Sequence, residues 1–206
     1  MPFDGTIMAL DVSSVATAMC FGRPGERPVF LHERLKREDD TTREAWGRAT
    51  LWANKQVMFF KPDRLIIEAG IARLGGKSNI GTIILLQQLI GIIGGIAQAR
   101  GVMPVPPKGE DYQVAVSTVR ARFLGNGRMS GEDAKPAAMK LCLALDWGPK
   151  TYDESDAGAV WYWACHQMRP DLVPPVAHLH AAIAAKQPIP ARLQRATEPA
   201  SQEAEF

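Results

Sequence analysis

Short apolar runs alternate with longer helical patterns along this chain. Residues 6–12 form an apolar run that ends in a polar patch, a pattern typical of a buried strand. Residues 15–21 could pair with this run as a hairpin, and residues 28–35 and 102–105 are further strand candidates. The run 65–68 is apolar up to its last residue, which predicts a strand in the centre of the sheet. The pattern therefore predicts an α/β fold with helices packed on a sheet.

Helical patterns fill the segments between and after these strands. Thr41 or Thr42 is placed to cap a helix that reaches about residue 60, because apolar residues then recur at three- and four-residue spacing. Ser130 is placed to cap another helix, which is predicted to reach about residue 145. Residues 153–168 are the last long helical segment.

One predicted helix, residues 79–100, is apolar almost all round, so it must be buried on more than one side. Gly91, Gly94 and Gly95 interrupt it, and each costs roughly 1 kcal/mol relative to alanine in a helix. That cost predicts that another backbone packs closely against these glycines.

Size and composition predict one globular domain with a hydrophobic core. The chain has 206 residues, of which 46% are hydrophobic and 22% charged. Residues 1–170 are expected to form the domain, and the proline-rich residues 171–206 an extension that is partly disordered. The net charge of +2 neither demands nor excludes a nucleic-acid partner.

The cysteines and the N-terminus predict a cytoplasmic protein. Cys20, Cys142 and Cys165 are far apart and have apolar neighbours, so we expect small buried side chains in a reducing compartment rather than zinc ligands. The N-terminus lacks the basic and apolar regions of a signal peptide. The most apolar stretch, residues 83–97, is expected to be too short to span a bilayer, so no membrane partner is predicted.

Four acidic residues lie beside apolar runs, where an unpaired charge is costly to desolvate. Asp11 and Glu68 close the runs that predict two buried strands. Asp153 and Asp156 lie one turn apart on one face of the last predicted helix. Each observation alone has a simpler explanation, because a helix N-terminus stabilises acids by roughly 0.3–1 kcal/mol and a strand-end acid can reach solvent. Two strand-end acids and a helix pair are harder to explain as coincidence.

Converging carboxylates would form a site for hard divalent cations, which prefer oxygen ligands. The sequence therefore predicts Mg²⁺ or Mn²⁺ at Asp11, Glu68, Asp153 and Asp156. Two such ions about 4 Å apart would stabilise the attacking and leaving oxygens of a phosphodiester. The sequence places no histidine as a general base, and His166 is expected to be an ordinary core or surface histidine.

The ordered set of acids resembles the RuvC-type Holliday junction resolvases of the RNase H-like superfamily. The residues that carry the resemblance are Leu10-Asp11-Val12-Ser13-Ser14, Ile66-Ile67-Glu68 and Asp153-Glu154-Ser155-Asp156-Ala157. That family has an Asp on its first strand, a Glu on its fourth and a D-x-x-D-A motif that opens its last helix. The order and rough spacing match over residues 5–168, about four fifths of the chain.

The resemblance implies a mixed five-stranded RNase H-like sheet, two Mg²⁺ or Mn²⁺ ions per active site, and symmetric cleavage of four-way DNA junctions by a homodimer. Helix 79–100 takes the place of the family's dimer helix, and the loop 71–78 that of a loop which inserts near the branch point. Lys135 matches a basic residue of the penultimate helix that approaches the scissile phosphate. Arg120 matches less closely the basic residue that precedes this helix.

The chain departs from the family pattern in three places. Residues 104–112 look like an insertion, which leaves open whether Lys108, Arg120 or Arg122 is the earlier basic residue. The C-terminal tail is an addition with no implied role. Gly158 stands where the family often has Leu, so the start of the last helix is expected to pack differently. These departures suggest a divergent member, such as a phage-borne one.

Two groups of basic residues differ in their neighbours. The first is interleaved with acids, which predicts a solvated face; its members are Arg34, Lys36, Arg37, Arg43 and Arg48. The second is less neutralised and is expected to contact phosphates; its members are Arg73, Lys77, Arg120, Arg122, Arg128 and Lys135.

Three alternatives to a junction resolvase stay open. The first is an RNase H-type ribonuclease or a branch or flap nuclease with the same acids. The second is an actin-like ATP-binding module, whose first hairpin is similar but which needs a second lobe and a Gly-rich motif that this chain does not show. The third is a junction-binding protein that does not cleave and whose acids are vestigial.

Overall fold

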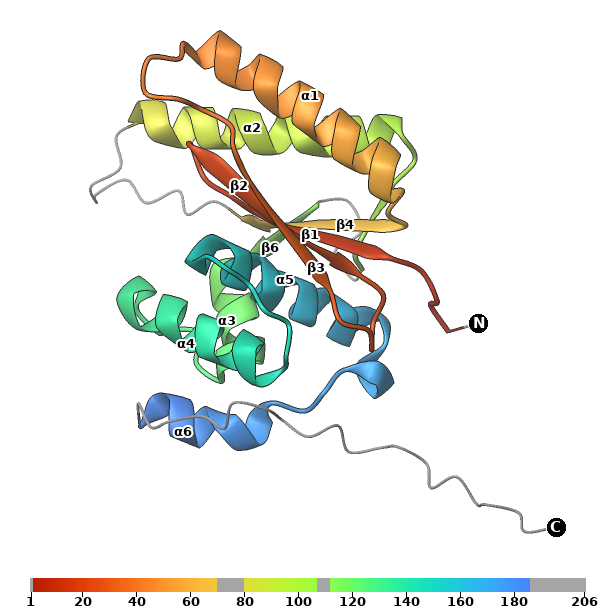
Figure 1. Ribbon diagram of the computed structural model, residues 1–206, viewed down its shortest axis with the longest axis vertical. Coiled ribbons are helices and arrows are strands. Elements are labelled where there is room, and N and C mark those ends of the chain that lie inside the picture. Colours follow the sequence, from red (N-terminus) through yellow and green to blue (C-terminus); the bar gives the residue numbers. More distant parts are fainter. Residues whose placement is uncertain (1, 70–79, 107–111, 186–206) are drawn as a thin grey trace, which may run out of the picture.

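The chain folds into three layers with a sheet in the middle (Figure 1). The computed structural model describes residues 2–69, 80–106 and 112–185. Two long helices cover one face of the sheet: α1 (Thr42–Phe60) and α2 (Ile80–Ala99). Three helices lie on the other face: α3 (Val116–Leu124), α4 (Gly131–Ala144) and α5 (Tyr152–Met168).

The sheet is mixed, as predicted, because β1 pairs antiparallel with β2 and parallel with β4. Its strands in the described part of the chain are β1 (Ile7–Val12), β2 (Ala16–Gly22), β3 (Val29–Arg34), β4 (Arg64–Ala69), β5 (Met103–Pro104) and β6 (Gln113–Ala115). The order across the sheet is β3-β2-β1-β4-β5, and β6 also pairs with β4.

The fifth position of the sheet holds two short strands: β5 lies within the predicted strand 102–105, whereas β6 was not predicted. β5 pairs with the start of β4, at Arg64 and Leu65, whereas β6 pairs with its end, at Ile67, Glu68 and Ala69. Both lie on the edge of β4 that β1 leaves free, so they share the fifth position. The prolines after residue 103 favour this break because proline cannot donate a ladder hydrogen bond.

Alternation along the strands creates two separate cores. Ile7 and Ala9 of β1 face α5, whereas Met8 and Leu10 belong to the cluster that includes α1 and α2. Successive strand side chains point to opposite faces. Position 11 therefore lies on the α5 face. The same alternation in β4, whose Ile66 packs in the α5 core, places position 68 on that face.

The two predicted helix caps are present. Thr41 caps α1 and forms a capping box with Glu44, and Ser130 caps α4 by accepting a hydrogen bond from the Asp133 amide at 3.2 Å. The three cysteines are buried and free, which confirms their expected role as small core side chains. α1 ends at Lys61, whose left-handed φ of 47° closes the helix.

α2 differs from its prediction in two respects. It has 20 residues and is, within the described chain, the one helix long and apolar enough to cross a membrane by length and composition. The prediction that this stretch is too short to span a bilayer is therefore wrong. α2 nevertheless packs on α1, where Trp46 donates a hydrogen bond to Gln88 at 3.2 Å.

The glycines of α2 also differ from their prediction. A Cβ atom added at Gly94 would lie 3.3 Å from the Tyr112 ring, so a side chain rather than a backbone packs there. At Gly91 and Gly95 no atom of the described residues lies within 4 Å of such a Cβ. The close backbone neighbour that we expected is absent from the described part of the chain.

The segment after α5 folds back on the α3–α4 side of the molecule (Figure 1). It contains two short 3-10 helices (Pro170–Leu172 and Ala177–Leu179) and α6 (His180–Ala184). Its buried apolar side chains join the α5 core; they are Val176, Leu179 and Ile183. A domain boundary at residue 170 stays a prediction, and residues 186–206 lie outside the described chain.

Gly158 explains how the start of α5 packs in this chain. A Cβ at this position would lie 3.1 Å from Cys142 Sγ and 3.3 Å from the Phe30 ring, so both neighbours approach the glycine closely. The space that a larger side chain would need is filled from α4 and β3.

We expect Gly158→Leu to lower the free energy of unfolding by roughly 1–3 kcal/mol, because the core around it is already full. Chemical denaturation measures the change. Gly47→Leu is the matched control, since a Cβ at Gly47 meets no described atom within 4 Å and leucine there gains up to about 1 kcal/mol of helix propensity. Equal effects of the two substitutions would contradict this packing.

Candidate metal centre

Two strand-end acids meet at one edge of the sheet. β1 and β4 are parallel, with Leu10 opposite Ile67, so Asp11 and Glu68 follow at neighbouring positions. Both side chains lie on the α5 face by the alternation described above. The fold thus places two carboxyl groups side by side at the carboxyl ends of two central strands.

The start of α5 is fixed by a capping box that the sequence reading missed. Thr151 accepts a hydrogen bond from the Glu154 amide at 3.1 Å, and the Glu154 carboxylate accepts one from the Thr151 amide at 3.3 Å. The same carboxylate also accepts a bond from the Lys150 amide. Glu154 is therefore buried for a structural reason, and it holds the turn that carries Asp153 and Asp156.

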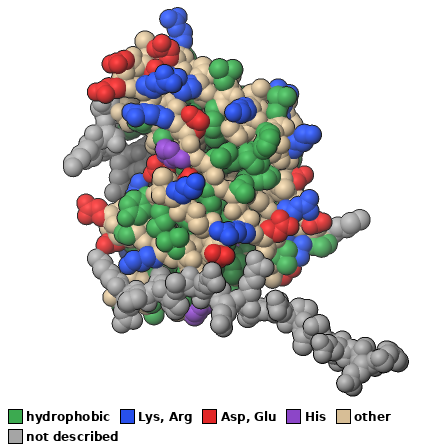
Figure 2. Space-filling model, viewed as in Figure 1, with side chains coloured by type: hydrophobic (Ala, Val, Ile, Leu, Met, Phe, Trp, Pro, Cys, Tyr) green, Lys and Arg blue, Asp and Glu red, His purple; other side chains and the backbone are tan. Residues whose placement is uncertain are grey.

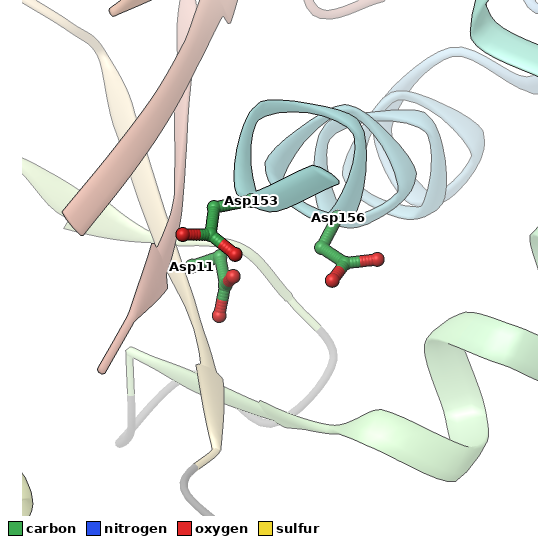
Figure 3. A group of neighbouring side chains, drawn as sticks. All are labelled: Asp11, Asp153 and Asp156. Carbon is green, nitrogen blue, oxygen red and sulfur yellow. The ribbon is translucent and has the colours of Figure 1, made fainter. Parts of the chain in front are cut away.

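Three carboxylates converge between β1 and α5. Asp11, Asp153 and Asp156 each offer an oxygen atom, and these oxygens lie within 4.8 Å of one another. Figure 3 shows the Asp11 side chain beside the first turn of α5, where Asp153 and Asp156 project toward the same space. Glu68 is outside this group of three, although its charge acts on Asp11.

Burial and mutual repulsion raise the pKa values of three of these acids. Burial, and then the charges of Glu68, Asp156 and Asp153, raise the pKa of Asp11 well above its usual range. Burial and the Asp156 charge raise the pKa of Glu68 to about 7. Burial raises the pKa of Asp156 to about 6, with a smaller contribution from Asp153.

Two basic side chains offset part of this negative charge. Lys135 Nζ lies 3.3 Å from Asp153 Oδ1 and 3.9 Å from Asp156 Oδ2. Partial burial alone would lower the pKa of Lys135, but the charges of the aspartates outweigh it and raise that pKa. Arg120 donates a hydrogen bond to the Met129 carbonyl at 2.8 Å, and its charge lowers the pKa values of Glu68 and Asp156.

The donor set fits a divalent cation. All the converging atoms are carboxylate oxygens, the ligands that Mg²⁺ and Mn²⁺ accept. Loss of solvation, with repulsion from neighbouring acids as the smaller cause, keeps the pKa values of Asp11, Glu68 and Asp156 raised although Lys135 and Arg120 oppose the shift. A cation between the carboxylates would relieve that repulsion.

The other predicted phosphate contacts fall into two groups. Arg73, Lys77 and Lys108 lie outside the described residues. Arg122 is exposed, and its Nη1 lies 3.4 Å from His166 Nε2 near the C-terminal part of α5. Arg128 is also exposed, so of the three described arginines in this group it is Arg120 whose charge reaches the carboxylates.

The predicted solvated face is mixed in charge. Arg48 pairs with Asp40, which also accepts a bond from the Arg37 amide. Figure 2 shows basic side chains spread over one face of the molecule with acidic ones between them. This pattern is consistent with ordinary solvated charge on that face.

His32 is the residue of this region that the sequence reading missed. Its Nε2 lies 3.4 Å from Asp153 Oδ2. In the sheet, Asp11 is opposite Ala18 and Ala18 is opposite His32, so the three share one row. Only the register of the three strands could have revealed this neighbour.

We expect Asp156→Asn to raise the melting temperature of the metal-free protein at pH 8 by roughly 2–4 °C, the shift that about 1 kcal/mol gives in a chain of this size. The pKa of Asp156 is about 6 in the folded chain, against about 4 for an unfolded aspartate. The folded state therefore binds this proton more tightly than the unfolded state does. The stability that comes from the protonated Asp156 carboxyl is lost as the pH rises through about 6.

Thermal unfolding in a chelator at pH 5 and pH 8 measures this effect. The gain should shrink at pH 5, where the wild-type carboxyl is largely protonated. Asp39→Asn, at an exposed position, is the control and should change neither melting temperature. A metal-free Asp156→Asn protein that melts below the wild type at pH 8 would contradict the electrostatic account.

The fold is similar to those of solved junction resolvases. RuvC of Thermus thermophilus matches with a TM-score of 0.58 at 15% identity, over 80% of this chain and 95% of that one. T. thermophilus RuvC in complex with a Holliday junction substrate gives a TM-score of 0.58 at 16% identity, over 81% and 94%. The yeast mitochondrial Holliday junction resolvase Ydc2 gives 0.53 at 10% identity, over 87% and 83%.

The sequence itself matches no protein-family model and no curated protein. The likeness is therefore one of fold. The mixed sheet with helices on both faces is an RNase H-like fold of the kind seen in RuvC, as the sequence resemblance predicts.

Proposed function

We propose that this protein is a metal-dependent, structure-selective endonuclease that resolves four-way DNA junctions by symmetric phosphodiester hydrolysis. The observation that carries the proposal is the convergence of the β1, β4 and α5 acids at one end of an RNase H-like sheet. The similarity in fold to RuvC, which has been solved with a Holliday junction substrate, supports DNA branches as the substrate.

Each acid has a role that its position supports. Asp11 belongs to the group of three with Asp153 and Asp156 and lies beside Glu68 on the neighbouring strand, so it is placed to be shared by two cations. Glu68 would complete one side and the two α5 aspartates the other. When bound, two Mg²⁺ or Mn²⁺ ions would supply the positive charge that the attacking and leaving oxygens of a phosphodiester require.

Lys135 and Arg120 would act on the substrate phosphate. In the structure Lys135 contacts two of the acids, and its side chain is 46% exposed, so its ammonium can turn to an incoming phosphate. Arg120 is held by the Met129 carbonyl, which fixes its guanidinium near Glu68. Arg122, Arg73 and Lys77 are proposed as further phosphate contacts.

Homodimer formation through α2 would supply the symmetry that a four-way junction needs. One side of α2 stays exposed over several turns, at Ile80, Ile84, Gln87, Gly91 and Gly95. These residues recur at four- and three-residue spacing, so they share a face. Ile80 is 63% exposed and Ile84 50%, which is unusual for isoleucines without a partner.

The open glycines on this face also favour a helix as the partner. A Cβ at Gly91 or Gly95 meets no described atom of the protomer, so the glycines are not required by its own packing. Two glycines four residues apart let a second helix approach closely. We therefore propose that the apolar side of α2 is covered by the α2 of a second copy rather than by lipid.

Asp156→Asn should abolish cleavage of a four-way junction while binding of the junction is kept. The substitution removes a ligand charge and leaves the shape of the site unchanged. Cleavage of a mobile four-way junction with Mg²⁺ or Mn²⁺ and binding in Ca²⁺ are the two measurements. Linear duplex, a flap and an RNA–DNA hybrid complete the panel, because an RNase H-type or flap nuclease would use the same acids.

Asp39→Asn is again the control and should cleave normally. Full activity of the Asp156→Asn protein would reject the metal centre. Equal cutting of linear duplex would reject junction selectivity, and preferred cutting of the hybrid would favour the ribonuclease.

Gly95→Leu should weaken the dimer, with a dissociation constant at least about tenfold higher, which corresponds to about 1.4 kcal/mol. A leucine on this face keeps the helices apart, whereas the helix itself tolerates leucine better than glycine. Sedimentation equilibrium measures the change, and Gly47→Leu on α1 is the control. A wild-type protein that is monomeric, or an unchanged dimer, would reject α2 as the interface.

A further inference from the structure

His32 lies in line with the acids although it belongs to the edge strand β3. Asp11, Ala18 and His32 form one row across β1, β2 and β3. Ala18 is fully buried and has no side chain beyond its Cβ, so it does not fill the space between the other two. α5 packs across β1 and β2, and its first turn brings Asp153 above this row.

Asp153 is held from two sides in this arrangement. Its Oδ1 faces Lys135 at 3.3 Å, and its Oδ2 faces His32 Nε2 at 3.4 Å. Among the described residues, His32 is the histidine that pairs with a carboxylate of the cluster. His166 instead faces Arg122, and His180 faces the Phe123 carbonyl.

We propose that His32 is a ligand of the cation on the Asp153 side, which makes that half of the centre a mixed nitrogen-and-oxygen site that prefers Mn²⁺ over Mg²⁺. The inference rests on the proposed function, because it takes the cation centre as given. It adds a ligand from β3, which the four predicted acids do not include.

The distance between His32 and Asp153 fits two ligands of one ion. Metal–nitrogen and metal–oxygen bonds of about 2.1 Å at right angles place the two ligand atoms about 3 Å apart. The observed 3.4 Å between Nε2 and Oδ2 is within a few tenths of an ångström of that value. His32 is outside the group of three whose oxygens lie within 4.8 Å of one another, so the ring would have to turn toward Asp11 and Asp156 to join them, and its 33% exposed side chain leaves room for that movement.

The chemistry of imidazole gives the expected preference. Mg²⁺ favours oxygen ligands and keeps its water molecules, whereas transition-metal cations accept imidazole. A site with carboxylates alone would discriminate less between the two ions. The presence of His32 beside Asp153 therefore favours Mn²⁺ on that side of the centre.

Pulsed electron paramagnetic resonance on the Mn²⁺-loaded protein tests the inference. A directly coordinated imidazole gives nitrogen-14 modulation of the Mn²⁺ signal, and we expect it in the wild type, alone or mixed with a four-way junction before freezing. His32→Gln should lose the modulation, and its Mn²⁺ affinity by calorimetry should fall about tenfold. Its Mg²⁺ affinity should change little, because the amide oxygen is a hard ligand.

His166→Gln is the matched control and should keep both the modulation and the affinity. Two results would overturn the role of His32 and leave the proposed function intact. One is Mn²⁺ binding that depends on Asp156 but shows no nitrogen-14 modulation. The other is modulation that survives His32→Gln. Absence of Mn²⁺ binding both with and without the junction would overturn the cation centre itself, and the His32 ligand with it.

Discussion

Partial burial and repulsion of neighbouring carboxylates are the constraint on which the rest of this structure depends. Asp11, Glu68 and Asp156 all have raised pKa values, first because burial removes water and then because neighbouring acids add negative charge: Glu68, Asp156 and Asp153 act on Asp11, Asp156 acts on Glu68, and Asp153 acts on Asp156. A fold gains nothing from such a cluster unless a cation is bound, since metal-free stability falls as these groups ionise. Lys135 and Arg120 reduce the cost without removing it, which leaves charge for metal ions to compensate. The cluster thus lowers the stability of the metal-free fold but favours cation binding. Such a conflict between stability and function is common at functional sites.

The surrounding fold is built to hold that repulsion in place. Strand alternation sends Asp11 and Glu68 to the α5 face, and the apolar residues before each strand end anchor both strands in two cores. α5 is buried along almost its whole length, so its first turn cannot drift away from β1. The capping box between Thr151 and Glu154 then stabilises that turn against the electrostatic repulsion between the carboxylates. A loop in the place of α5 would move apart and lose the ligand geometry.

The sequence predicted the parts of this arrangement that depend on local patterns. The strands, the Thr41 and Ser130 caps and the order of the four acids all follow from periodicity and turn chemistry within a few residues. The second short strand at the fifth position, β6, and the place of His32 could not be predicted in this way, because they depend on which strands pair and in what register. The helix itself was predicted closely, at 79–100 against Ile80–Ala99, but its capacity to span a bilayer was misjudged because only residues 83–97 were counted. In the structure Gln88 is satisfied by Trp46, a contact between helices that the sequence does not show.

β4 connects the two surfaces that the proposed function requires. Glu68 points from this strand to the α5 face, while Leu65 and Ile67 point to the opposite core, which also holds the inner side of α2. The outer side of α2 carries the exposed isoleucines and open glycines. A two-fold axis at that outer side would relate the metal centres of two copies. Within each copy, the metal centre and the outer side of α2 would then be joined by β4 and α2, which pack in one core with no hinge among the described residues. Cuts placed symmetrically about a junction need a fixed separation of two centres, and a core shared by β4 and α2 supplies it more directly than a flexible connection would.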